Sequence, residues 1–214
     1  SRPAPGVDLA EIGFEALAKR FKRSKTKQTD LEGLKAAIRA ELERMISLNK
    51  TRMNFREEFE KLIDEYNAGS WNIEEMYNKL LHISHNLTDE EKRHVREEMS
   101  EEELVIFDIL TRPAPRLSPE ERTEVKKVAH ILLPRIKELL VINWRNKSSA
   151  RSQVKITIED VLDIGLPRSY SPDIYKSKCS AVFEHVYESY PERNAGVYTS
   201  SYYPGAPANA DFIY

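Results

Sequence analysis

The chain has 214 residues, of which 40% are hydrophobic and 32% charged, so it is long enough to bury one good core or two smaller ones. A formal net charge of -2 and a pI near 6.3 exclude a surface that is basic throughout, so any contact with nucleic acid must be local. A single cysteine excludes an internal disulfide, no apolar leader points to secretion, and the longest apolar stretch is too short and too charged to span a bilayer, so we expect a cytoplasmic protein.

The N-terminal part of the chain combines a linker with amphipathic helices. Residues 1–6, SRPAPG, are typical of a linker, and a helix is expected from 7 to 21. A longer apolar stripe follows from 31 to 48 at three- and four-residue steps. Thr29 or Asp30 can cap this second helix.

Two further stripes have the same spacing. The stripe from 55 to 66 is followed by Gly69, which suits a left-handed helix end, and the next stripe covers 73 to 81. Thr88 and Glu91 have the spacing of a capping box, which predicts that a separate polar helix begins there.

A second capping box, Ser100 with Glu103, stands directly before an apolar run from 104 to 110. Three glutamates at 101–103 suit the positive end of a helix dipole, and a helix that is apolar on all sides must be enclosed by others. The prolines in the following RPAPR, 112–116, prevent this helix from continuing.

The C-terminal third of the chain is also predicted to be helical. Ser118 caps a helix whose apolar face runs from 125 to 140, and Ser171 caps a last helix that reaches Tyr190. Between them, VKITIED alternates apolar and polar residues, so a strand is one alternative. We favour a short helix that is capped by Thr157 and ends at Leu162, because a lone strand has no partner.

These elements predict an all-α fold, an irregular multi-helix bundle of about seven to nine helices with a non-helical C-terminal tail. The helical domain covers 7–191, and an alternative division into two subdomains would place their junction near 112–118, at the prolines. Residues 192–214 lack periodicity and are expected to form an irregular tail.

No motif marks a nucleotide site or a complete catalytic group, since the chain lacks GxxxxGK[ST] and GxGxxG. His82 and His85, with His94, could hold part of a metal site, but zinc takes three or four ligands at defined spacing, so surface histidines are favoured. For Cys179, a buried apolar role is favoured over a nucleophile activated by His185. We therefore expect no catalytic residue and no metal site.

A basic run, KRFKRSKTK, places six cations within nine residues. These cations are Lys19, Arg20, Lys22, Arg23, Lys25 and Lys27. Such a cluster can contact several phosphates of DNA, with an affinity that falls steeply with salt. The alternative is a solvated connection between two helices, because the run has no glycine and only Phe21 as a stacking aromatic residue.

A sparser basic set follows the long helix: Trp144, Arg145, Lys147 and Arg151. These residues are candidates for a partner interface, where tryptophan and arginine are enriched. For Trp144 itself we favour a packing role at the helix end, with its indole N–H donating to a carbonyl.

Six segments together carry a resemblance to a known family. They are LNKTRMNF (48–55), LIDEYNAGS (62–70), EEMSEEELVIFDILTRP (97–113), EVKKVAHILL (124–133), NWRNKSSARSQVKITIEDVLD (143–163) and YKSKCSAVFEHVYESY (175–190). In content and order they resemble the C-terminal helical region of the restriction (motor and nuclease) subunit of type I restriction-modification enzymes.

The resemblance implies a prokaryotic parent subunit, a type I site-specific deoxyribonuclease with a PD-(D/E)xK nuclease domain and two motor domains that use ATP and Mg to translocate DNA. No motif of those domains is present here, so no catalytic residue is carried over. For the C-terminal region the resemblance implies docking onto the methyltransferase core, built from the methyltransferase (M) and specificity (S) subunits, and coupling to the motor. The alternative function is a DNA-binding element that contacts the translocated duplex through 19–27.

Overall fold

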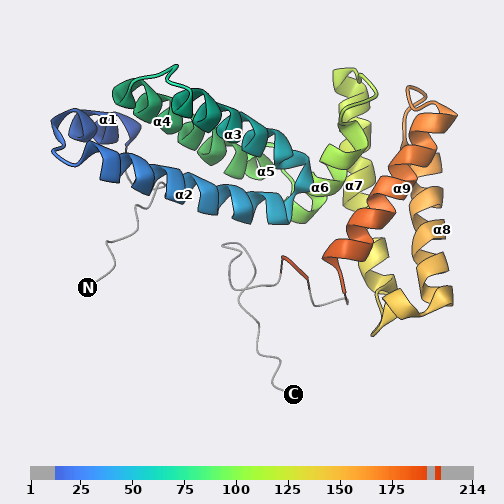
Figure 1. The fold of residues 1–214 in the computed structure, drawn as a ribbon. Helices are drawn as coiled ribbons and strands as arrows, with labels where there is room; N and C mark the ends of the chain where they lie inside the picture. The colour runs from blue at the N-terminus through green and yellow to red at the C-terminus, as the bar shows by residue number, and fades with distance from the viewer. Residues whose placement is uncertain (1–12, 192–195, 199–214) are drawn as a thin grey trace. The chain divides into compact units, whose positions relative to one another are not determined.

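The computed structural model describes residues 13–191 and 196–198. Within these residues the chain folds into helices and connecting turns without strands, which confirms the predicted all-α class (Figure 1). The helices of this part of the chain are α1 (Phe14–Arg23), α2 (Lys27–Leu48), η1 (Lys50–Arg52), α3 (Met53–Asn67), α4 (Ile73–Glu91), α5 (Arg93–Arg96), α6 (Glu101–Thr111), α7 (Pro119–Leu139), η2 (Trp144–Asn146), α8 (Ser148–Gly165) and α9 (Pro172–Ser189). The expected linker at 1–6 and nearly all of the expected tail at 192–214 lie outside the described residues.

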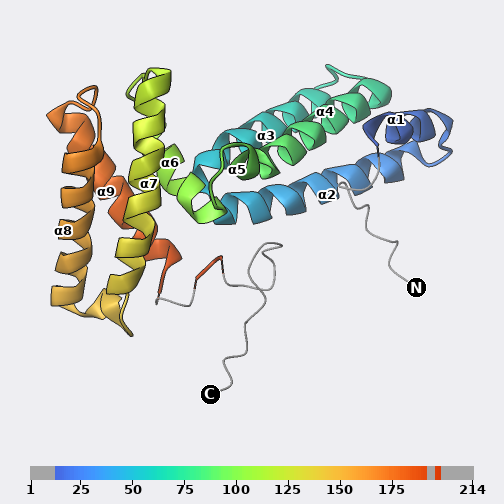
Figure 2. The same ribbon diagram turned by 180° about the vertical axis from the view of Figure 1, so that it is seen from behind.

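The chain divides into two compact units, Ser1–Glu98 and Met99–Tyr214, here called the N-terminal and C-terminal units. In the N-terminal unit, α1, α2 and α3 pack against α4 (Figures 1 and 2). The predicted stripes supply its core, in which Leu31, Ile38, Phe59 and Leu80 have no exposed surface. Burial of these stripes explains why the helices form at their predicted positions.

The start predicted for the second helix of this unit, at Thr29 or Asp30, is wrong. The second helix begins at Lys27, directly after Thr26, so Thr29 and Asp30 lie inside its first turn. No side chain caps this end. An acidic residue in the first turn still interacts favourably with the helix dipole, which accounts for the signal that the sequence carried.

The second wrong start is the polar helix expected at Thr88, which lies inside α4 and donates its hydroxyl to the carbonyl of Ser84 at 3.0 Å. The capping box of α4 is instead formed by Asn72 and Glu75. The capping-box spacing at Thr88 starts no new helix, because no residue upstream of it interrupts α4. The predicted left-handed glycine after α3 is confirmed, since Gly69 has a φ of 84°.

In the C-terminal unit, α7, α8 and α9 lie side by side, and α6 packs on α7 and α9 (Figures 1 and 2). The predicted capping box at the start of α6 is present, and the predicted cap of α7, Ser118, forms a capping box with Glu121. In the first of them, Glu103 donates its backbone N–H to Ser100 Oγ at 3.1 Å and accepts the Ser100 N–H at 2.8 Å. The predicted start of α9 at Ser171 is also confirmed.

The region of the alternative strand is part of α8, so neither a strand nor a helix beginning at Thr157 forms there. Val154, Ile158 and Leu162 are separated by four residues and are all buried, whereas Ile156 is 47% exposed. Helical spacing therefore describes this segment better than the two-residue alternation.

The division between the units falls at Glu98 and Met99, whereas the sequence-based alternative placed a junction near 112–118. The prolines lie within the C-terminal unit because α6, which precedes them, packs against α7 and α9. At the end of α6, Lys178 from α9 donates to the carbonyls of Ile109 and Arg112 at 2.8 and 2.7 Å. These bonds satisfy helix-end carbonyls that the prolines leave without a continuing helix.

Candidate functional site

The basic cluster lies where α1 leads into α2. Helix α1 carries Lys19, Arg20, Lys22 and Arg23, Lys25 stands in the connection, and Lys27 begins α2. The opposite face of α1 is buried, with Phe21 stacked on Tyr77 of α4 at a centroid distance of 3.7 Å. This packing turns the cations of α1 outward, where they are exposed.

One of the six cations is paired within the N-terminal unit. Lys27 donates to Oε1 of Glu74 on α4 at 2.6 Å and lies over the ring of Phe21. The hydrogen bond from Lys27 holds the pKa of Glu74 below its ordinary value. Within the described residues, the other five cations form no ion pair, so they remain able to meet an anion.

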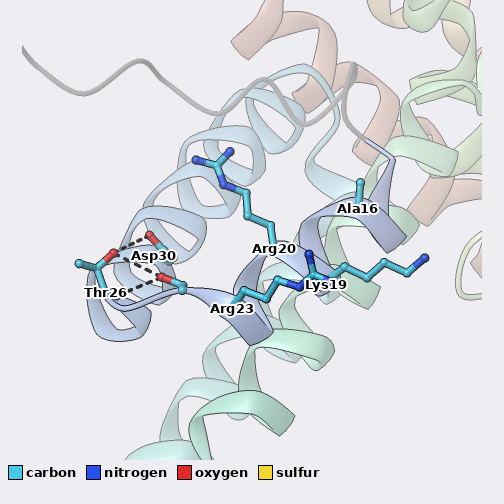
Figure 3. A pocket seen from close by; sticks show the side chains of 7 residues that line it. Ala16, Lys19, Arg20, Arg23, Thr26 and Asp30 are labelled. Atoms are coloured by element: carbon cyan, nitrogen blue, oxygen red, sulfur yellow. Dashed lines mark hydrogen bonds between the residues drawn. The ribbon is translucent and has the colours of Figure 1, made fainter.

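A hollow of about 600 Å³ borders the cluster, and its lining consists of Ala16, Lys19, Arg20, Arg23, Ser24, Thr26 and Asp30. Figure 3 shows the three cations projecting from α1 around it, with Thr26 and Asp30 on the side of α2. The Thr26 hydroxyl donates to the Asp30 carboxylate at 3.5 Å. The three cations of the lining can attract phosphate by charge.

The residues considered for other chemistry stand apart from this hollow. His82 and His85 are exposed on α4, and His85 pairs with Asp89 at 3.4 Å and meets the edge of Phe14. Across the described ranges, no group of three or more His, Cys, Asp or Glu side chains is placed to hold a metal ion. Burial raises the pKa of the Cys179 thiol, which disfavours the reactive thiolate.

The second basic set is organised by Trp144, which is completely buried in the C-terminal unit. Its indole N–H donates to the carbonyl of Tyr190 at 2.8 Å, and its ring meets Phe183 and Tyr187 edge-on. The packing role favoured for Trp144 therefore agrees with the structure. The assignment of Trp144 to a partner interface is corrected, because a side chain without exposed surface cannot touch a partner.

The three cations of this set remain at the surface. Arg145 donates to the carbonyl of Glu188 at 3.0 Å and lies over the ring of Tyr187, and Arg151 donates to the carbonyl of Arg145 at 2.6 Å. Lys147 is exposed directly before α8. Hydrogen bonds thus hold both arginines in place, whereas the lysine extends into solvent.

The exposure of two apolar residues next to these cations, Val141 and Ile142, was not predicted from the sequence. Val141 is 47% and Ile142 74% exposed, although both extend the apolar run that ends α7. The one available signal was Asn143, a residue that tolerates the left-handed conformation and here has a φ of 59°. A turn at Asn143 takes the two preceding residues off the buried face.

Among the described residues, no helix has both the length and the hydropathy needed to cross a membrane.

A family model described as the C-terminal domain of "Type I restriction enzyme HindI endonuclease subunit-like" proteins matches residues 6–192. Comparisons with curated proteins and with solved structures gave no match. The family match spans both units and agrees with the resemblance carried by the six segments. The chain therefore belongs to the family of C-terminal domains of type I restriction enzyme endonuclease subunits of the HindI-like kind.

Proposed function

We propose that this domain docks the endonuclease subunit onto the methyltransferase core of a type I restriction enzyme, built from M and S subunits, and couples it to an ATP- and Mg-dependent DNA motor. The observation that carries the proposal is a set of large apolar side chains exposed around the end of α7: Val141, Ile142 and, in contact with Trp144, Tyr187. A domain from a multi-subunit enzyme family is expected to have a surface that binds another subunit, and exposed apolar area often marks such a surface.

The test is binding of the purified 214-residue chain to the purified methyltransferase complex. We expect the two to co-elute in gel filtration, and an excess of the chain to displace the intact endonuclease subunit and so inhibit DNA cleavage. Circular dichroism would first establish that the chain is helical. A helical chain that neither co-elutes nor competes would overturn the docking proposal.

DNA contact by the basic cluster is a second candidate, favoured by five cations without ion pairs, three of which line the hollow. Changing both Lys22 and Arg23 to Glu should weaken duplex binding more than tenfold and lower the salt slope by about two. A matched control changes Lys127 and Arg135, two exposed cations of α7, to Glu. Equal DNA affinity of the two double variants would exclude this candidate.

A further inference from the structure

The connection between α7 and α8 presents its apolar residues on a rigid turn. The backbone N–H of Trp144 donates to the carbonyl of Val141 at 3.0 Å, which closes a turn with Ile142 and Asn143 at its centre. Leu140 and Trp144 are buried on either side, so both ends of the turn are anchored in the core. Ile142 and Val141 are therefore held outward in a fixed conformation, which reduces the entropy lost when a partner covers them.

Cations surround this turn. The stretch from 140 to 155 contains four of them, Arg145, Lys147, Arg151 and Lys155, and no carboxylate. Within the part of the chain that the structure describes, none of the first three forms an ion pair. On the elements packed against this stretch, Glu138 lies on α7 and Glu184 and Glu188 lie on α9, and Arg145 donates to the backbone carbonyl of Glu188.

The start of α8 adds to the same electrostatic character. The capping boxes of α4, α6 and α7 bring a glutamate to the first turn, whereas α8 has no side-chain cap and no acidic residue there. The partial positive charge of this helix end is therefore not offset by a carboxylate of its own first turn. Together with Lys147 and Arg151 it favours an acidic group on whatever approaches the turn.

We propose that these features form one docking surface, the α7–α8 surface, defined by Val141, Ile142, Arg145, Lys147 and Arg151. The partner of the α7–α8 surface is a protein of the methyltransferase core that offers an apolar recess for Ile142, bordered by carboxylates. This inference rests on the proposed function. A nucleic acid fits less well, because its phosphates would contact the cations but leave Val141 and Ile142 in water.

The inference is tested by measuring the affinity of the 214-residue chain for the methyltransferase complex. Ile142→Asp places a carboxylate on the turn and should raise Kd about tenfold to a hundredfold. Lys147→Glu should slow association several-fold at low salt, because it reverses a charge at the edge of the surface. It should leave folding intact, since a glutamate beside the start of α8 suits the helix dipole.

Matched controls make the same chemical changes elsewhere in the C-terminal unit. Ile164, near the other end of α8, is 85% exposed, and Lys176 is exposed in the first half of α9. We expect Ile164→Asp and Lys176→Glu to bind like the unchanged chain. Circular dichroism and urea unfolding check that all four variants are folded.

The outcomes separate this inference from the proposed function. If the unchanged chain fails to bind the methyltransferase complex, docking itself is wrong. If the unchanged chain binds and Ile142→Asp binds equally well, docking is correct but the α7–α8 surface is not its site. If Lys147→Glu weakens binding to duplex DNA and leaves binding to the methyltransferase complex unchanged, the surface serves nucleic acid and the inference is overturned.

Discussion

At the scale of single residues, Glu103 shows how one carboxylate serves both a helix end and a neighbouring helix. It accepts the backbone N–H of Ser100 at 2.8 Å and lies 2.9 Å from Nδ1 of His130 on α7. Burial acts to raise the pKa of Glu103, but the hydrogen bonds from Ser100 and His130 act in the opposite direction, and the pKa lies below its ordinary value of 4.5. The ionised form is therefore favoured by folding.

This preference predicts a pH-dependent effect of Glu103→Gln. A carboxylate with a lowered native pKa stabilises the fold above its unfolded value of 4.5, and this contribution disappears as pH falls through the native pKa. The variant should lose about 0.5–1 kcal/mol near pH 7 and approach the unchanged chain near pH 3. Urea unfolding at both pH values measures this, with Glu124→Gln on the exposed side of α7 as control. A loss of the same size at both pH values would contradict the assignment.

Arg52 is a residue whose role no local pattern could reveal. It is 1% exposed, donates to Oε1 of Glu90 at 3.1 Å and donates to the carbonyl of Met45 at 3.2 Å. Its partner Glu90 is separated from it by 38 residues, and Arg93 donates to the same carboxylate. The sequence identified the apolar stripes of these helices, but a buried ion pair depends on which helices meet, and spacing within one helix does not contain that information.

Arg52→Met should therefore cost about 3 kcal/mol, because it leaves a buried carboxylate with only part of its compensation. Arg93→Met should cost less, since the Arg93 side chain is more exposed. In a double-mutant cycle, the variant carrying both Arg52→Met and Glu90→Gln should lose less stability than the sum of the losses of the two single variants. Urea unfolding supplies the three free energies, and strict additivity would show that the two side chains do not depend on each other.

At the scale of elements, capping patterns predicted helix starts only where the preceding chain was already interrupted. Ser100 follows Glu98, whose φ of 56° breaks the helical path, and Ser118 follows the prolines. Thr88 and Thr157 follow uninterrupted helix and therefore lie inside α4 and α8. The basic cluster was predictable in the same local sense, whereas the pairing of Lys27 with Glu74 joins residues 47 apart.

Two glycines in helices predict opposite responses to alanine. A Cβ on Gly165, the last residue of α8, would lie 2.6 Å from Cγ2 of Val128 on α7, a buried and β-branched side chain that cannot turn away. A Cβ on Gly33 in α2 would meet nothing within 4 Å. Gly165→Ala should destabilise the chain by about 1–3 kcal/mol, while Gly33→Ala should stabilise it by about 0.5–1 kcal/mol.

Thermal or urea unfolding of the two glycine variants gives the comparison directly. Because both changes add one methyl group to a helix, their difference isolates the close approach of α8 to α7. An equal or stabilising response at Gly165 would mean that α7 and α8 adjust without strain.

At the scale of the whole molecule, the fold class followed from the sequence, but the division of the chain did not. Each apolar stripe predicts a helix, because the spacing of its apolar residues can be seen within a single segment of the sequence. Which unit α6 belongs to depends instead on distant partners, as in the hydrogen bond from Tyr170 to the carbonyl of Leu110. Prolines after α6 therefore resembled a junction, although the chain changes units earlier, at Glu98 and Met99.

This division predicts that the two units fold independently when they are expressed as the fragments 13–98 and 99–191. The N-terminal unit buries its own cluster around Leu31, Ile38 and Phe59, and the C-terminal unit buries its own core around Trp144. Domains of about 60 residues already bury enough surface to fold alone, and both fragments exceed that length.

Each fragment should show a helical circular dichroism spectrum and a cooperative urea transition. The fragment 99–191 carries the whole α7–α8 surface, so it should also retain binding to the methyltransferase complex, while 13–98 should retain any affinity for DNA that the basic cluster provides. A fragment that is unfolded alone and regains helicity only when mixed with the other would show that one core depends on both halves of the chain. In that case docking and DNA contact could not be assigned to separate units.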